Sequence, residues 1–380
     1  MFSFLKNLFG TNNNENSANE NIKKTIDTES LEKEFIQLKK QLSTSNDNNI
    51  IEILNKLGEV CTNLNKIDDA ISYYEQSLKK QWKNLLLINL ISFYIKGLIV
   101  MYTTLKEVLA KADKYNFTVG SFNTHNLEML PYMIRAAKDM GSPISIQTSV
   151  GTARYIGYGV LASVCKYMAD NEGLDIVLHL DHAAKFTDIK EAIENGYSSV
   201  MFDGSALPLK ENILRTQEVV EFAHKRGVSV EAELGTIGGT EEGIAVAAHE
   251  VKYTDPKIAK QFVEATNVDA LAVAVGTNHG QYKSKTDINF DLLKEIHETV
   301  DIPLVIHGGT GVKEEDIHKC TNYGVRKFNV GTELLVGWTK KAMEKFATTK
   351  ENASLRNNIV PCNEVVYEIV KHKIGIFLNK

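Results

Sequence analysis

Three histidines, His182, His279 and His307, each follow or end a short apolar run that is rich in β-branched residues. The runs are DIVLHL, DALAVAV and IPLVI, and their composition is typical of buried parallel strands. Three imidazoles that converge at strand ends suit a catalytic zinc ion, which usually takes three protein ligands and leaves one position open. The pattern therefore predicts a metal that acts as a Lewis acid.

The rest of the chain must supply the strands that position these histidines. Eight such runs occur, separated by amphipathic stretches of helical length, several of which end at a Gly that can cap a helix. The runs are TVGSF (118–122), PISIQTS (143–149), DIVLHL (175–180), SSVMFD (198–203), VSVEAEL (228–234), DALAVAV (269–275), IPLVIH (302–307) and KFNV (327–330). This alternation predicts an α/β fold, a (β/α)8 barrel with two further helices at its ends.

Polar residues close every one of these runs. They are Asn123, Ser149, Asp181 with His182, Asp203, Glu233, His279, His307 and the segment 329–332. Because barrel enzymes carry their chemistry at the carboxyl ends of the strands, the pattern predicts an active site there. The glycine-rich segments HGGTG and NVGT follow strands seven and eight, where barrels commonly bind phosphate through backbone amides. A phosphorylated substrate beside the metal is therefore expected.

Six motifs, in order, carry a resemblance to a known family. They are LHLDH, SVMFDGSALPLKENI, VSVEAELGTIGG, AVAVGTNHGQYK, LVIHGGTGV and KFNVGTE. Together they resemble the class II, zinc-dependent ketose-bisphosphate aldolases, from about Met101 to the C-terminus. The resemblance implies a lyase that reversibly cleaves fructose 1,6-bisphosphate to dihydroxyacetone phosphate and glyceraldehyde 3-phosphate. Tagatose 1,6-bisphosphate or another ketose bisphosphate is the alternative substrate.

The resemblance also implies roles for individual residues. His182, His279 and His307 would hold the zinc, and Asp203 and Glu233 match positions that bind a second or displaced metal; a monovalent cation is also possible in the family. Asp181 matches the carboxylate that takes the C4 hydroxyl proton, and Glu241, with Glu242 in reserve, matches a second base on the glycine-rich loop 235–250. The implied substrate contacts are Asn123, Ser149, Gly280, Gly308, Gly309, Thr310, Asn329, Val330, Gly331, Thr332 and Arg356.

Some residues depart from the family pattern or argue against another mechanism. Gly331 stands where the family commonly has Asp or Asn, Leu335 stands where it has Arg or Lys, and Ser354 replaces an acidic residue. The resemblance therefore does not define the aldehyde-side phosphate pocket. A Schiff-base aldolase would need a lysine at a strand end. Lys327 is expected to begin its strand and Lys283 lies in a loop, so neither suits that mechanism.

Composition divides the chain into three parts. Residues 1–30 are rich in Asn, Glu, Ser and Thr and are expected to be disordered. Residues 31–100 have helical periodicity, and the piece 55–80 resembles a tetratricopeptide repeat; an ordinary helical hairpin is the alternative. Residues 101–380 form the barrel. An interaction scaffold with an inactive barrel is the alternative function, and its partner would bind the helical extension.

Charge and cysteine usage bound the partners and the compartment. The formal charge of -5 disfavours nucleic-acid binding. The first ten residues are expected to be a frayed terminus, with a weak interfacial anchor as the alternative, and the apolar stretch 85–102 is expected to be a packed helix, so no stable membrane span is predicted. Four widely spaced cysteines without a CxxC pair fit a reducing cytoplasm. The family further implies a homo-oligomer, either a dimer or a tetramer.

Overall fold

The computed structural model describes nine stretches of the chain. They are residues 28–44, 47–64, 66–80, 101–236, 238–241, 244–246, 252–279, 288–351 and 353–379. The chain divides into two compact units, Met1–Leu98 and Ile99–Lys380.

The first unit contains three described helices, which confirms the predicted all-α extension. They are α2 (Thr28–Thr44), α3 (Asp47–Asn63) and α4 (Ile67–Lys80). The apolar faces of α2 and α3 meet at Leu38, Ile53 and Leu57. Helices α3 and α4 approach closely at Gly58, where an added Cβ would lie 2.6 Å from the ring of Tyr74. The expected disordered segment 1–30 lies outside the described residues except for 28–30, which begin α2, and the expected helix over 85–102 lies outside them except for 101 and 102, which are not helical.

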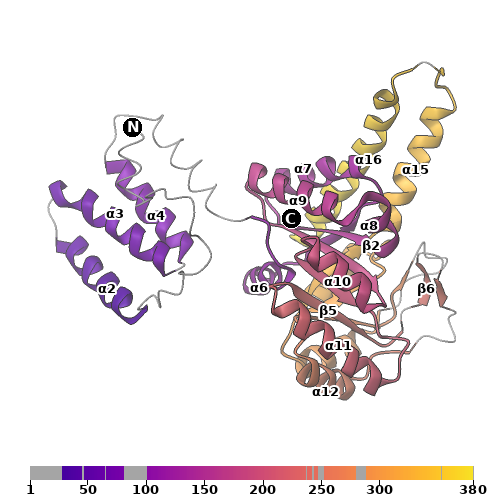
Figure 1. Ribbon diagram of the computed structural model, residues 1–380, viewed down its shortest axis with the longest axis horizontal. Coiled ribbons are helices and arrows are strands. Elements are labelled where there is room, and N and C mark those ends of the chain that lie inside the picture. The colour runs from indigo at the N-terminus through magenta and orange to yellow at the C-terminus, as the bar shows by residue number, and fades with distance from the viewer. Residues whose placement is uncertain are drawn as a thin grey trace. The chain divides into compact units, whose positions relative to one another are not determined.

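Eight parallel strands close into a barrel in the second unit, so the predicted (β/α)8 fold is confirmed (Figure 1). The strands are β1 (Val119–Asn123), β2 (Ile144–Ser149), β3 (Ile176–Ala183), β4 (Ser199–Phe202), β5 (Ser229–Leu234), β8 (Ala270–Val273), β10 (Leu304–Ile306) and β11 (Val325–Val330). Their order around the barrel is β1-β11-β10-β8-β5-β4-β3-β2. Each corresponds to one of the eight apolar runs. One boundary was wrong: β11 begins at Val325, so Lys327 lies within its strand.

Helices follow the strands and cover the outside of the barrel (Figure 1). They are α7 (Leu130–Met140), α8 (Val150–Ile156), α9 (Tyr158–Glu172), α10 (Phe186–Glu194), α11 (Leu209–His224), α12 (Pro256–Thr266), α13 (Phe290–Thr299), α14 (Glu314–Asn322), α15 (Thr332–Phe346) and α16 (Leu355–Phe377), with the short 3-10 helix η1 (Leu127–Met129) before α7. Their apolar faces and the outward faces of the strands form one continuous core, which includes Phe122, Ile146 and Phe328. The barrel is thus a rigid support for its strand ends.

Helix α6 (Leu105–Tyr115) closes the end of the barrel at which the strands begin. Its buried residues Leu105, Val108 and Leu109 belong to one cluster with Val119 and Val305 of the strands. The helix begins with a capping box, in which the Thr104 side chain accepts from the Glu107 amide and the Glu107 side chain accepts from the Thr104 amide. Solvent and substrate therefore reach the barrel from the opposite end, where the strands finish.

A small second sheet was not expected from the sequence. Strands β6 (Gly238–Glu241) and β7 (Ile244–Val246) form an antiparallel pair inside the glycine-rich loop 235–250. Strand β9 (Asn278–His279) pairs with β6 in parallel. The sheet therefore joins the chain after β5 to the chain after β8, at the end of the barrel where polar residues gather.

Candidate active site

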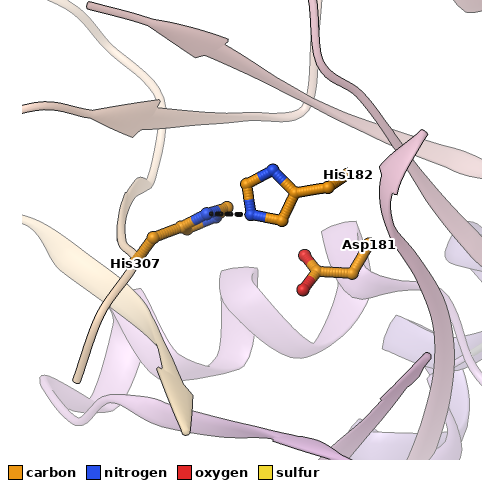
Figure 2. Close-up of side chains that lie close together, drawn as sticks. All are labelled: Asp181, His182 and His307. Carbon is orange, nitrogen blue, oxygen red and sulfur yellow. Dashed lines mark hydrogen bonds between the residues drawn. The ribbon is translucent and has the colours of Figure 1, made fainter. Parts of the chain in front are cut away.

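Asp181 and His182 are adjacent in sequence, yet both lie in the mouth of the barrel (Figure 2). Neighbouring residues of a regular strand point to opposite faces. Here β3 advances three residues, from Leu180 to Ala183, while its partner β4 advances two. This β-bulge inserts one residue, and His182 takes a positive φ of 46°. The irregularity lets a carboxylate and an imidazole face the same site.

His182 is held by a carboxylate from the next strand. Its Nδ1 lies 2.9 Å from Oδ2 of Asp203, and the other Asp203 oxygen accepts from the amide and hydroxyl of Ser205. Burial alone would raise the pKa of Asp203, but the hydrogen bond and the charge of His182 and the bonds from Ser205 lower it far below its usual range. The ionised carboxylate can only accept, so Nδ1 of His182 carries a proton.

His307 is held in the same way from the opposite side. Its Nε2 lies 2.8 Å from Oε1 of Glu231, in the middle of β5, and both side chains are fully buried. Burial lowers the pKa of His307, which keeps the ring neutral. Glu231 stays ionised because the charge of Lys327 and the hydrogen bond from His307 outweigh its burial and lower its pKa. Nε2 of His307 is therefore the protonated nitrogen.

These two tautomers leave both remaining nitrogens with lone pairs that face each other. Nε2 of His182 and Nδ1 of His307 are 2.9 Å apart, and the rings stand nearly perpendicular (Figure 2). Two lone pairs that point at one place repel unless a proton or a cation shares them. A neighbouring carboxylate that fixes the tautomer of a liganding histidine is the usual support of a metal site. The chemistry of this donor set therefore fits a divalent metal ion.

Asp181 and Glu233 extend the donor set of the two histidines in different directions. Ligand atoms of Asp181, His182 and His307 lie within 4.8 Å of one another, and so do those of His182, Asp203 and Glu233. Glu233 is buried, and its Oε2 lies 3.6 Å from Nδ1 of His307. The two groups share His182, so one ion could take either of two neighbouring positions.

The carboxylate of Asp181 is buried and is oriented by two amide side chains. Gln147 donates from Nε2 to Oδ2 over 3.0 Å, and Asn329 donates from Nδ2 to Oδ1 over 3.4 Å. Gln147 also donates to Oδ1 of Asn123 over 2.7 Å. Ser149 lies beside Asp181 in the register of β2 and β3. Asn123, Ser149, Asp181 and Asn329 therefore share one end of the barrel.

The two glycine loops also lie against each other at this end. The Gly309 amide donates to the Asn329 carbonyl over 3.0 Å, and a Cβ at Gly309 would lie 2.5 Å from that carbonyl oxygen. Gly331 packs on Asn123, whose Oδ1 would lie 2.6 Å from an added Cβ. Helix α15 begins at Thr332 without a side-chain cap, so its first amides are open to an anion. Gly308, Thr310 and Val330 belong to the same two segments.

Several predicted site residues are not placed by the structure. Gly280 and Glu242 lie outside the described residues, and only the backbones of His279, in β9, and Glu241, in β6, are described. The roles of His279 as a metal ligand, Gly280 as a substrate contact and Glu241 or Glu242 as a base therefore stay predictions.

Arg356 is described, but it lies in the first turn of α16 and is exposed. Helices α15 and α16 pack side by side, and the loop that joins them points away from the barrel (Figure 1). The length of α15 separates Arg356 from Thr332 by roughly 20 Å. The structure thus does not bring Arg356 to the strand ends of its own barrel.

Three residues around the site were missed from the sequence: Gln147, Glu231 and Lys327. Each lies inside a buried strand, and all are fully buried. The signal was present, because charged or amide residues inside an apolar strand must find partners. His179, by contrast, is buried in β3 and bonds Ser199.

Comparison with known proteins covers the barrel unit. The sequence pattern of the family described as "Fructose-bisphosphate aldolase class-II" matches residues 103–380. The fructose-bisphosphate aldolase of Staphylococcus aureus is 40% identical over 277 residues, which is 72% of this chain and 96% of that protein; its Staphylococcus epidermidis counterpart is 41% identical over the same shares. The solved structure of the YdjI aldolase from Escherichia coli K12 has a TM-score of 0.64 and 31% identity, and covers 73% of this chain and 97% of its own. None of these matches supports the resemblance of residues 55–80 to a tetratricopeptide repeat.

Proposed function

Because the chain belongs to the class II fructose-bisphosphate aldolase family, we propose that it reversibly cleaves fructose 1,6-bisphosphate to dihydroxyacetone phosphate and glyceraldehyde 3-phosphate. This lyase reaction serves glycolysis and gluconeogenesis. The family implies a metal ion, and we propose that the ion is Zn²⁺. The observation that carries the proposal is the pair of facing imidazoles, each with its tautomer fixed by a carboxylate, beside the buried Asp181.

His182 and His307 would hold the ion together with His279, and Asp203 and Glu233 would serve a second or displaced position. When bound, the ion supplies Lewis-acid stabilisation of the negative charge that develops on substrate oxygens. Asp181 would take the proton of the C4 hydroxyl while the bond from C3 to C4 breaks and C4 becomes an aldehyde. The bond's electron pair stays on C3, and Glu241, or Glu242, would then return a proton to C3.

The substrate's phosphates would bind at the loops that surround these groups. The amides at the start of α15, beside the loop 308–310, suit the phosphate of the dihydroxyacetone phosphate half. Ser149, on the Asp181 side, would contact the phosphate of the aldehyde half. Gly331 has no side chain that could select between the two configurations at C4. Tagatose 1,6-bisphosphate, which differs from the fructose compound only at C4, therefore stays the alternative substrate.

A coupled assay tests the proposal with both sugars. Protein treated with EDTA and then dialysed should lose at least about 90% of its cleavage of fructose 1,6-bisphosphate, and Zn²⁺ should restore it. Turnover that is unchanged after complete metal removal would refute the metal assignment, and cleavage of neither sugar by the zinc-loaded protein would refute the substrate. Borohydride added with substrate should trap no covalent adduct.

The alternative of a scaffold with an inactive barrel is disfavoured by the hydrogen bonds that hold Asp181, His182 and His307 in place. A homo-oligomer, a partner for the helical extension and a cytoplasmic location stay predictions. All four cysteines are buried free thiols, and no helix in the described parts of the chain is long and apolar enough to cross a membrane.

A further inference from the structure

We propose that Lys327 is a positioning residue that orients both halves of the active site, His307 through Glu231 and Asp181 through Asn329. The inference rests on the proposed function of this site and adds a residue to it. Lys327 touches neither of the two groups that it orients. It acts by fixing Glu231, which accepts from His307, and Asn329, which donates to Asp181.

Lys327 occupies an unusual place for a lysine. It lies in the middle of β11, its side chain is fully buried, and it points into the barrel, whereas its neighbour Arg326 points outward and pairs with Asp113. Lysine is almost never fully buried unless it is paired, because an isolated ammonium loses its hydration. The ammonium must therefore be compensated within the barrel.

The first connection crosses the barrel interior to β5. Nζ of Lys327 lies 2.9 Å from Oε2 and 3.2 Å from Oε1 of Glu231, and β5 is separated from β11 by two strands. Oε1 also accepts the N–H of His307. The same carboxylate thus neutralises the ammonium and fixes the tautomer that aims the other His307 nitrogen at His182. Without the ammonium, the carboxylate would be a buried charge without a counterion, which is strongly unfavourable.

The second connection runs along one face of β11. Lys327 and Asn329 are two residues apart and therefore point to the same side. Nζ donates to Oδ1 of Asn329 over 2.7 Å. Because an ammonium can only donate, the amide of Asn329 must turn its oxygen to Lys327 and its NH₂ group to Asp181, where Nδ2 lies 3.4 Å from Oδ1. An uncharged residue at position 327 would leave the amide free to flip.

These contacts also explain why this buried lysine does not act as a Schiff-base amine. Its three acceptor atoms, two on Glu231 and one on Asn329, use the three N–H groups of an ammonium. Lys327 is therefore bound as a cation in the floor of the site. Its contribution is orientation and charge balance.

Zinc affinity, measured by competition with a chelating dye, tests the inference without substrate. We compare Lys327→Met, which keeps the length but removes the charge, with Lys327→Arg, which keeps the charge. The matched control is Arg326→Met, which removes a buried cation from the same strand on its outward face. Thermal unfolding of the metal-free proteins reports whether each variant folds.

Lys327→Met should weaken zinc binding roughly 10- to 100-fold, as loss of an outer partner of a metal ligand typically does. At saturating zinc its kcat should still fall at least about 10-fold because Asp181 is misoriented, whereas Arg326→Met should change neither value. Lys327→Arg should bind zinc more tightly than Lys327→Met. A role in filling space alone gives the reverse order, because Met fits the volume better, and that order would overturn the inference.

The inference can still be tested if Lys327→Met does not fold or if the wild-type protein is inactive. If Lys327→Met does not fold, Glu231→Gln takes its place: a loss of at least 10-fold in zinc affinity supports the inference, and unchanged affinity overturns it. If the wild-type protein cleaves no ketose bisphosphate, the proposed function fails, but the zinc measurements still decide whether Lys327 orients His307.

Discussion

At the scale of single residues, the site depends on a backbone conformation that residues with side chains seldom adopt. His182 has a φ of 46° at the bulge of β3. Such a conformation costs on the order of 1–3 kcal/mol and persists only where the surrounding structure enforces it. Here the hydrogen bond of His182 to Asp203 and the pairing of β3 with β4 around the bulge hold it in place. The strain brings Asp181 and His182 to one site.

Asp181 can serve as a base or as a metal ligand, because its carboxylate belongs to the same group of atoms as His182 and His307. We expect Asp181→Asn to lower kcat about 10²- to 10⁴-fold, the usual contribution of a positioned proton carrier. Zinc affinity should stay within about 3-fold of wild type. Steady-state kinetics and chelator competition measure the two quantities. A large loss of zinc affinity would instead assign Asp181 to the metal.

At the scale of elements, α6 and the first residues of the strands close the end of the barrel that lies opposite the site. The helix is fixed at its first turn by Glu107, whose carboxylate accepts from Thr103, from the hydroxyl of Thr104 and from the Thr104 amide. Burial raises the pKa of Glu107, but these hydrogen bonds together outweigh it and lower the pKa below 4.5. The cap therefore depends on the ionised carboxylate.

Glu107→Ala, which removes the carboxylate from the capping box, should reduce the free energy of unfolding by about 0.5–1 kcal/mol at pH 7, the lower part of the range for loss of a helix cap. Because the folded-state pKa is the lower one, the ionised cap stabilises the fold above pH 4.5, and this contribution is lost as pH falls below that value. The difference between wild type and variant should therefore shrink on acidification. Urea unfolding of the metal-free proteins at pH 7, 5 and 4 measures it. A constant difference would show that the charge of Glu107 is irrelevant.

At the scale of the whole molecule, the chain joins a unit of residues 1–98, whose described parts are mainly helical, to a barrel unit that carries every described site residue. The family pattern covers residues 103–380 only. The three described helices of the first unit have their own core around Leu57. The two parts therefore have separate cores.

A protein that begins at Met101 should fold and keep its kcat/KM for fructose 1,6-bisphosphate within about 2-fold of the full chain. The physical reason is that the barrel has its own core and its own floor, α6. The coupled aldolase assay and thermal unfolding of both proteins provide the comparison. A loss of more than about 10-fold in a folded barrel would show that residues 1–100 take part in catalysis.

The sequence by itself determined the eight strands, the family and the residues that end each strand, because strand periodicity and strand-end chemistry are local properties. Gln147, Glu231 and Lys327 could have been noticed as polar residues within apolar runs. Their partners could not have been found, since Glu231 and Lys327 are 96 positions apart and meet only across the closed barrel. The bulge that turns His182 toward His307 and the pairing of β6 with β9 also depend on tertiary contacts. Tertiary structure decided these features because each depends on neighbours that only the folded chain brings together. A buried charge, for example, is stabilised by the opposite charge that lies nearest in space.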